Sequence, residues 1–193
     1  MISRTASLPG SLLCLALLAA PAAAQTSLGR AAATFPEDFG SIQTVRELRD
    51  GRILVADPLG GALYLVDMDA GKRTLVGSKG QGPQEWLQPD AVWPLPGDST
   101  LLVDLGNARL VTLAPDLTFR GTRPIAQGDF EPGRPLVLAL PQGVDGTGSV
   151  YFRTLGRGLG GEPADSGAIL RLPRGGGAAV SVATIKLQDQ PTT

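Results

Sequence analysis

The chain contains no histidine and a single cysteine among its 193 residues. Without histidine it cannot form a Ser-His-Asp triad, a Cys-His pair or a histidine-bound zinc or iron site, so enzymes that depend on those groups are excluded for this chain. A single cysteine cannot form an internal disulfide, and burial of apolar side chains therefore has to stabilise the fold. We expect no catalytic residue, no cofactor and no metal ion in this chain.

An excess of charge of one sign is also absent. The 17 Lys and Arg residues nearly balance the 18 Asp and Glu residues, for a formal net charge of −1. Removal of residues 1–24, which contain one basic residue, Arg4, would leave 16 basic residues and 18 acidic ones, a net charge of −2. Such a chain has no positive field to attract nucleic acid or an anionic membrane, so we expect neither as a partner.

Long hydrophobic runs are absent except at the N-terminus. The Leu-rich stretch Leu8–Ala20 is too short for a membrane span of about 20 residues, and small residues precede Gln25. We therefore predict a signal peptide at residues 1–24 and a periplasmic or secreted mature chain without a stable membrane anchor; an uncleaved anchor is the alternative. Cys14 follows the bulky Leu13, where a lipoprotein signal carries a small residue, so we reject lipid anchoring.

Glycine and proline, in contrast, are abundant. The 26 glycines and 16 prolines are spread between short apolar runs instead of being gathered in one linker. This spacing is typical of turns between strands and argues against a helical protein. The sequence therefore predicts many short β-strands.

Residues 45–67 and 92–113 are two copies of one pattern. Each copy has a short strand, an Asp-Gly or Gly-Asp turn, an apolar strand that ends in Asp57 or Asp104, a glycine turn and a second apolar strand. The two aspartates are 47 residues apart (104 − 57), and we place a single-residue indel in the second turn. A period in the forties built from short strands is typical of β-propeller blades.

The sequence therefore predicts an all-β fold of four-stranded antiparallel propeller blades in an incomplete ring. We expect a lead-in segment at 25–44, which either precedes the blades as a flexible segment or donates a strand elsewhere. A partial propeller is expected at 45–193, with about three blades at 45–90, 91–140 and 141–193. The expected outer strands are Lys72–Gly77, Leu117–Thr122 and Ala178–Leu187, and the glycine-rich Thr154–Gly167 is an expected insertion in the third blade.

Three blades cannot close a ring, because propellers have about 4–8 of them. An open half would expose the apolar faces that normally pack between blades. Either the chain is a fragment, which we favour, or two copies associate through their open blade edges and complete a ring.

The connection between the two copies reads Gly-Ser-Lys-Gly-Gln-Gly-Pro-Gln-Glu-Trp-Leu-Gln-Pro over residues 77–89. It resembles the inter-blade signature of bacterial exported six-bladed β-propellers of the NHL/TolB-like kind, in which a Gly-x-Gly-Pro-Gly-Glu-Phe run precedes a proline. The matching residues are Gly80, Gly82, Pro83, Glu85 and Pro89, whereas Gln84 replaces a glycine and Trp86 replaces a phenylalanine. Asp57 and Asp104 resemble the Val-Ala-Asp strand ends of the same repeats, and Asn107 and Arg109 resemble their Gly-Asn-x-Arg-Ile turn.

The resemblance covers residues 42–122 well and 146–187 weakly. It implies a fold and an exported location but no activity, because most such proteins have no known function and a minority are lyases, lactonases or hydrolases. Physically, we expect the glycines to permit a tight crossing between blades, Pro83 to stiffen it and Trp86 to fill the gap between sheets. We expect Asp57 and Asp104 to bond the turns that follow them, with a ligand at the blade ends as the alternative.

Three other motifs are interpreted as structural. Gly156–Gly161 has dinucleotide-loop spacing, but Pro163 argues against the helix that such a site requires. Gly77–Gly82 lacks the lysine of a phosphate loop, and Asp67–Gly71 lacks the later ligands of a calcium loop, so we predict a connection and a hairpin turn. Arginines at strand ends, namely Arg109, Arg153 and Arg171, are expected to be solvated, with a channel anion as the alternative.

The function we predict is an exported β-propeller binding or interaction module for an unknown protein, peptide or glycan. The alternative is a fragment of an exported propeller lyase or hydrolase whose catalytic residues lie in missing blades. A third interpretation is a stub without independent function.

Overall fold

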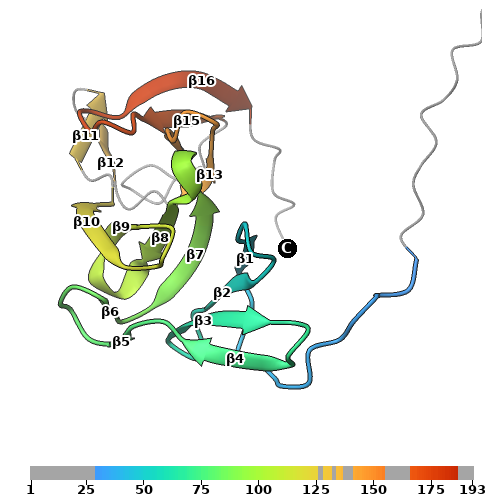
Figure 1. The fold of residues 1–193 in the computed structure, drawn as a ribbon. Helices are drawn as coiled ribbons and strands as arrows, with labels where there is room; N and C mark the ends of the chain where they lie inside the picture. The colour runs from blue at the N-terminus through green and yellow to red at the C-terminus, as the bar shows by residue number, and fades with distance from the viewer. Residues whose placement is uncertain (1–28, 126–127, 132–133, 137–140, 155–165, 187–193) are drawn as a thin grey trace, which may run out of the picture. The chain divides into compact units, whose positions relative to one another are not determined.

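The computed structural model describes residues 29–125, 128–131, 134–136, 141–154 and 166–186. The chain divides into two compact units, Met1–Ala32 and Ala33–Thr193, and the elements below belong to the second. The regular secondary structure of the described part is nearly all β-strand (Figure 1), and its helical pieces are the single 3-10 turns η1 (Pro96–Asp98) and η2 (Leu105–Asn107). The predicted all-β class is confirmed. The predicted signal peptide and the Gly156–Gly161 motif lie outside the described residues.

Three four-stranded antiparallel sheets follow one another along the chain, and we call them blades 1, 2 and 3. Blade 1 consists of β1 (Thr44–Glu47), β2 (Ile53–Asp57), β3 (Ala62–Asp67) and β4 (Lys72–Leu75). Blade 2 consists of β7 (Pro89–Pro94), β8 (Thr100–Asp104), β9 (Arg109–Leu113) and β10 (Phe119–Pro124). Blade 3 consists of β13 (Pro141–Val144), β14 (Val150–Arg153), β15 (Ser166–Leu172) and β16 (Val180–Lys186). Each blade is a meander in chain order, as predicted for propeller blades.

Two smaller pairings join the blades. The parallel pair β5 (Ser78–Lys79) and β6 (Glu85–Trp86) lies in the connection between blades 1 and 2. The antiparallel pair β11 (Gly128–Glu131) and β12 (Arg134–Leu136) lies between blades 2 and 3. Neither pair was expected from the sequence, because both are too short to show an alternating pattern.

The blades pack face to face, and blade 2 is covered on both sides. The first inter-blade core combines Leu54, Ala56 and Leu63 of blade 1 with Val92, Leu102, Val111 and Leu113 of blade 2. The second combines Leu101, Val103 and Leu110 of blade 2 with Val150, Phe152 and Leu170 of blade 3. Successive residues of β8 thus enter different cores, because side chains alternate along a strand. Each buried leucine contributes about 1.5–3 kcal/mol to the stability of this packing.

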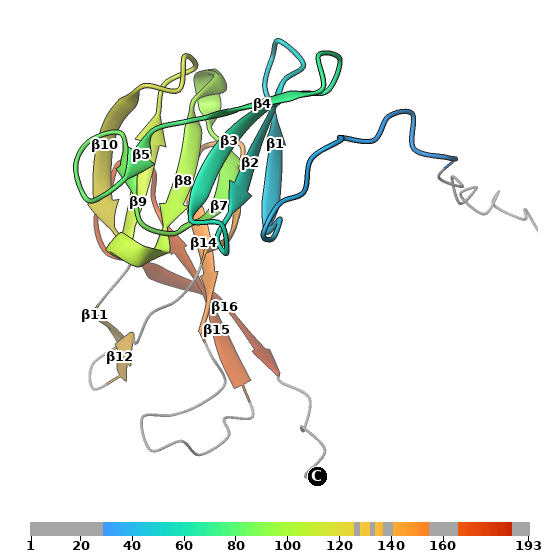
Figure 2. The same cartoon turned by 90° about the horizontal axis from the view of Figure 1, so that it is seen from below.

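The first strands of blades 1 and 2 lie next to each other. The N–H of Val92 on β7 donates to the Thr44 hydroxyl on β1 at 2.6 Å, and that hydroxyl lies 3.3 Å from the Val92 carbonyl oxygen. Figure 2 shows the strands of the two blades side by side. Consecutive four-stranded meanders that pack face to face with adjacent first strands are the arrangement of β-propeller blades.

The strand register corrects one detail of the predicted repeat. Asp57 pairs with Ala62 across the second turn of blade 1, and Asp104 pairs with Arg109 across the second turn of blade 2. Both the aspartates and their partners are therefore 47 residues apart, since 109 − 62 = 104 − 57 = 47. The indel placed in this turn was wrong, because the two turns have the same length.

Candidate functional site

Asp104 is the centre of the best-developed polar cluster in the described residues. It is the last residue of β8 and is fully buried. Its Oδ1 accepts hydrogen bonds from the backbone N–H groups of Leu87 and Gln88, both at 3.1 Å. Its Oδ2 accepts from Asn107 Nδ2 at 2.6 Å and from Arg109 Nε at 3.1 Å. A buried carboxylate needs such partners, and here they tie the end of β8 to the chain that enters β7.

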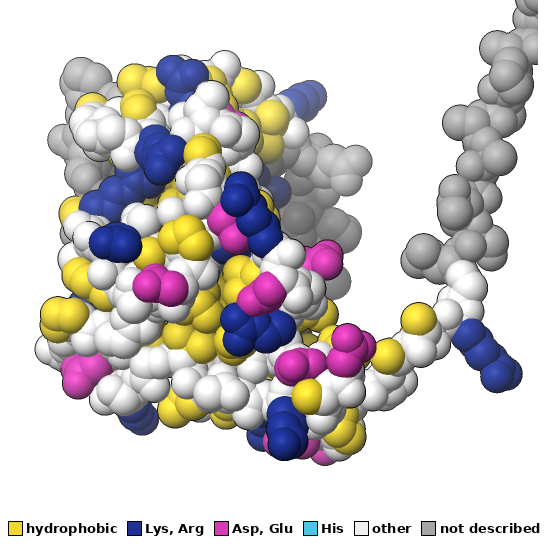
Figure 3. Space-filling view, viewed as in Figure 1, with side chains coloured by type: hydrophobic (Ala, Val, Ile, Leu, Met, Phe, Trp, Pro, Cys, Tyr) yellow, Lys and Arg dark blue, Asp and Glu magenta, His cyan; other side chains and the backbone are white. Residues whose placement is uncertain are grey.

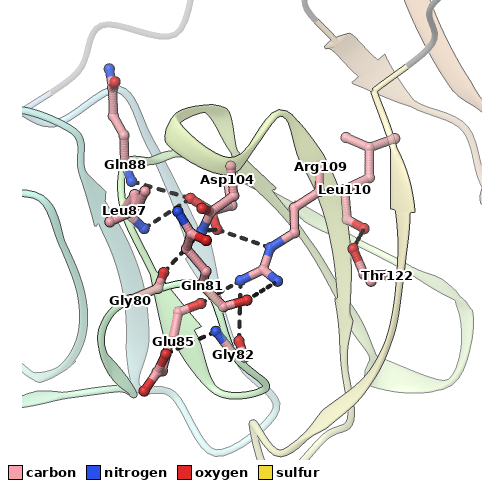
Figure 4. Close-up of polar contacts among 11 residues, drawn as sticks. Gly80, Gln81, Gly82, Glu85, Leu87, Gln88, Asp104, Arg109, Leu110 and Thr122 are labelled. Atoms are coloured by element: carbon pink, nitrogen blue, oxygen red, sulfur yellow. Dashed lines mark hydrogen bonds and ion pairs between the residues drawn. The ribbon is translucent and has the colours of Figure 1, made fainter.

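Arg109 extends this cluster to the connection between blades 1 and 2. Besides its ion pair with Asp104, its guanidinium donates to three backbone carbonyl oxygens (Figure 4). These belong to Gln81 at 2.9 Å, Gly82 at 3.2 Å and Glu85 at 2.6 Å. Arginine suits this task because its planar guanidinium offers five donors in a fixed geometry. Arg109 is thus bound within the protein and is not a solvated arginine.

The connection closes on itself through Glu85. The Glu85 carboxylate accepts the N–H of Gly82 at 2.8 Å, and Asn107 Nδ2 donates to the carbonyl oxygen of Gly80 at 3.0 Å. A Cβ atom at Gly80 would overlap the Glu85 carboxylate. The chain therefore turns sharply at residues 80–85, which is the role expected for these glycines beside Pro83.

Trp86 fills the space between blades 1 and 2. It is 1% exposed, belongs to the first inter-blade core, and donates from Nε1 to the Val76 carbonyl oxygen at 2.7 Å. A Cβ atom at Gly77, where φ is +76°, would lie 2.5 Å from Trp86 Nε1. Pro89, the last residue of the signature, begins β7 and pairs with Asp104. The structure thus brings Gly80, Gly82, Glu85, Trp86 and Pro89 into one junction with Asp104, Asn107 and Arg109.

Asp57 forms the equivalent junction with the segment that precedes blade 1 in the chain. Its carboxylate accepts the N–H groups of Gly40, Ser41 and Gly60, each at 2.8 Å. Burial by itself would raise the pKa of this carboxyl, but the three N–H donors and the positive charge of Arg73 outweigh burial and lower the pKa below its usual value. Asp57 thus holds the segment before blade 1 as Asp104 holds the segment before blade 2.

Sequence reasoning missed that the lead-in repeats the inter-blade signature. Gly40 and Ser41 precede Leu87 and Gln88 by 47 residues, the spacing of the two aspartates they bond. The same step relates Pro36-Glu37-Asp38-Phe39 to Pro83-Gln84-Glu85-Trp86. This signal was present in the sequence, but Phe39 in place of Trp86 and Asp38 in place of Glu85 concealed it.

The lead-in packs on blade 1 through aromatic and charged contacts. The Phe39 ring meets Tyr64 edge-on, with centroids 5.8 Å apart, and the Arg73 guanidinium lies 5.1 Å from Phe39 and 4.6 Å from Tyr64. Arg73 also pairs with Glu37 at 2.9 Å and donates to the Asp38 carbonyl oxygen at 2.6 Å. These cation–π and ionic contacts hold residues 37–39 against β3 and β4.

Arg46 was also not expected from the sequence. It lies on β1, is 5% exposed, and crosses to blade 2. There it pairs with Asp98 at 2.8 Å and donates to the Thr100 hydroxyl. Burial lowers the pKa of Arg46, while the charge of Asp98 opposes that shift. An arginine in the buried position of an alternating strand joins two blades here, because its long side chain spans the distance.

The other predicted candidates remain separate from these junctions. Arg153 and Arg171 are exposed on blade 3. Asp67 accepts the Ala70 N–H at 2.8 Å, so Asp67–Gly71 is the β3–β4 turn. Across the described residues, no group of three or more acidic, cysteine or histidine side chains is arranged to hold a metal ion, and no helix is long and apolar enough to cross a membrane.

Comparison with known proteins places this chain by fold alone. No family model and no curated protein matches the sequence. Among solved structures, a presumed exported protein from Bacteroides fragilis matches with a TM-score of 0.53 and 14% identity, over 78% of this chain and 39% of that chain. A catalytically inactive virginiamycin B lyase from Staphylococcus aureus with quinupristin matches with a TM-score of 0.48 and 14% identity, over 83% of this chain and 45% of that chain. This chain thus spans less than half the length of either protein.

Proposed function

We propose that this chain is part of an exported β-propeller of the NHL/TolB-like kind and that it works by binding another protein. The blade architecture and the junction residues support the family, and the signal-like N-terminus supports export to the periplasm or the medium. The presumed exported protein from Bacteroides fragilis has the same fold, which agrees with that location. The binding role itself depends on the distribution of exposed apolar side chains.

Among the residues whose burial the structure describes, the exposed large hydrophobic side chains lie beside blades 1 and 3. Those near blade 1 are Ile42, Val45, Leu59 and Leu75, with exposures of 54%, 55%, 80% and 53%. Those on β16 of blade 3 are Val180 and Val182, with exposures of 43% and 46%. Within residues 89–124, which form blade 2, no large hydrophobic side chain is exposed to this extent. Grouped exposed apolar side chains mark interaction sites, and protein surfaces are the partners that cover them best.

The charged residues of the junctions support the same conclusion, because they are already bound to other groups of the protein. Asp57 binds backbone N–H groups, and Asp104 and Arg109 bind each other and the inter-blade connection. Their charges are used to position the blades. A partner therefore meets the terminal blades instead of the junctions.

The test is site-specific photo-crosslinking in producing cells. A photoreactive phenylalanine analogue placed at Leu59 or at Leu75 should give a discrete adduct with a protein. The same analogue at Arg120, which is exposed on β10 of blade 2, is the matched control and should give none. Absence of adducts at all three positions, with the variants exported and folded, would refute the binding role.

A further inference from the structure

Blade 1 has a second apolar face, directed away from blade 2. By strand alternation this rear face of blade 1 consists of Val45, Val55, Tyr64 and Val66, because their neighbours Leu54, Leu63 and Leu65 pack toward blade 2. Addition of 47 to each number gives Val92, Leu102, Val111 and Leu113. Those are the residues by which blade 2 packs against blade 1. The rear face of blade 1 therefore has the composition of a face that receives another blade.

The rear face also carries its own gap-filling aromatic residue. Trp86 fills the space between blades 1 and 2, and Phe39 precedes it by 47 residues. Phe39 packs against Tyr64 of the rear face, while Trp86 shares a core with Val111, the residue equivalent to Tyr64. The lead-in and Asp57 already form the junction that precedes blade 1 in the chain. The rear face of blade 1 is therefore preorganised to receive a blade, which lowers the entropic cost of docking.

Blade 3 presents the complementary face. Phe152 and Leu170 pack toward blade 2, so the residues that alternate with them point away and form the front face of blade 3. These residues are Tyr151, Arg153, Ile169 and Arg171, together with Val180, the partner of Arg171 on β16. The arginines are exposed, and no ion pair forms at either within the described residues.

Blades 1 and 3 differ in net charge. Residues 36–41 and 44–75 contain seven acidic and five basic residues, a net charge of −2. The described residues of blade 3, 141–154 and 166–186, contain one acidic and four basic residues, a net charge of +3. On the face seen in Figure 3, acidic and basic side chains are intermixed over β1 to β4, whereas mainly Lys and Arg appear over β15 and β16. Opposite net charges of the two blades favour contact between them.

We infer that the rear face of blade 1 binds the front face of blade 3 of a second copy of this chain. This inference rests on the proposed binding role and names the partner. The contact joins two different surfaces, so it is head-to-tail and closes into a ring only if the rotation between copies permits. The contact buries Val45 of the rear face, which is 55% exposed, and Val180 of the front face, which is 43% exposed, and it joins blades of opposite net charge.

The existing contact between blades 1 and 2 shows which charges meet. Leu54 and Leu65 are paired on blade 1, and Tyr151 and Arg171 are paired at the equivalent places on blade 3. Leu65 packs against the core to which Leu117 of blade 2 contributes. The residue 47 positions before Leu117 is Ala70, in the β3–β4 turn beside the exposed Asp69. By this analogy we pair Arg171 of one copy with the exposed Asp69 of the other, and the experiment tests that pair.

The experiment is a charge exchange between two variants of the full chain, Arg171→Asp and Asp69→Arg, followed by analytical ultracentrifugation. Each variant alone faces its own copy with like charges, so its self-association should weaken at least tenfold. An equimolar mixture of the two variants should associate as well as the unchanged chain, because every contact between unlike variants restores opposite charges. Arg120→Asp on blade 2 changes the net charge equally and should not weaken association.

Circular dichroism of each variant checks that it is folded, and the rescue by mixing excludes a folding defect as the cause. A chain that stays monomeric at about 100 µM, far above the Kd of specific protein contacts, overturns the inference. Equal association of all variants also overturns it. If the photo-crosslinks from Leu59 and Leu75 then contain a different protein, the binding role stands while the second copy is rejected. If no adduct forms at all, both fail.

Discussion

Asp104→Asn should destabilise the protein more than any other isosteric substitution in the described residues. The amide keeps the shape of the side chain but replaces one acceptor oxygen with an NH2 group and removes the charge. Asp104 is fully buried, and it accepts hydrogen bonds from Leu87, Gln88, Asn107 and Arg109. Whichever way the amide points, its NH2 group faces existing donors, and the Arg109 guanidinium loses its counter-ion.

The expected loss follows from these contacts. Hydrogen bonds to a charged group contribute about 1.5–3 kcal/mol each, and removal of one partner of a buried ion pair costs about 3–5 kcal/mol in total. We therefore expect the free energy of unfolding to fall by about 3–5 kcal/mol. With a urea m-value of about 2 kcal/mol/M, the unfolding midpoint falls by about 1.5–2.5 M.

Tryptophan fluorescence during urea unfolding measures this loss, since Trp86 is buried between the first two blades and Trp93 packs against the second inter-blade core. Asp116→Asn, at an exposed aspartate of blade 2 outside the proposed contact between copies, is the matched control and should shift the midpoint little. The double variant Asp104→Asn with Arg109→Met should show a coupling of about 0.5–3 kcal/mol, because the two side chains are in contact. A loss below about 1 kcal/mol for Asp104→Asn, or no coupling, would refute the reasoning.

Three further predictions concern the core between blades 1 and 2, the turn at Gly77 and the β13–β14 turn of blade 3. Trp86→Ala should lower the free energy of unfolding by about 3–5 kcal/mol through the cavity between blades 1 and 2, and Trp86→Phe by less, as measured in urea. Gly77→Ala should lower the melting temperature, since its φ is +76° and its methyl group would meet the Trp86 indole; Gly51→Ala, at φ +82° with open space around it, separates backbone strain from this overlap. Hydrogen bonds from Thr147, Ser149 and Tyr151 lower the pKa of Asp145 to about 2, so its contribution to stability is present above the unfolded pKa of about 4 and is lost as the pH falls toward 2. Asp145→Asn should flatten the acid limb of the melting temperature in that range, and an unchanged limb would contradict the assignment.

The positions of most strands followed from local information. Short runs such as Ile53–Asp57 and Thr100–Asp104 alternate or concentrate branched apolar residues between glycine turns, and the structure has strands at those residues. Strand β13 was not foreseen, because Pro141 and Gly143 have low strand propensity and only pairing with β14 makes the segment extended. The lead-in was also left undecided, although its junction with Asp57 depends on residues that are adjacent only after folding.

The sequence by itself determined the all-β class, the 47-residue step and the residues of the inter-blade signature, because turn chemistry and strand periodicity act over a few neighbouring residues. Tertiary structure alone decided the partners of the charged groups. Three such contacts join segments that are distant in the chain. Arg109 binds the carbonyl oxygens of residues 81–85, and Arg46 reaches Asp98. Phe39 packs against Tyr64 in the place that Trp86 takes one blade later. Such contacts form when apolar faces pack and bury polar groups that must then find partners, and no local pattern specifies which ones they meet.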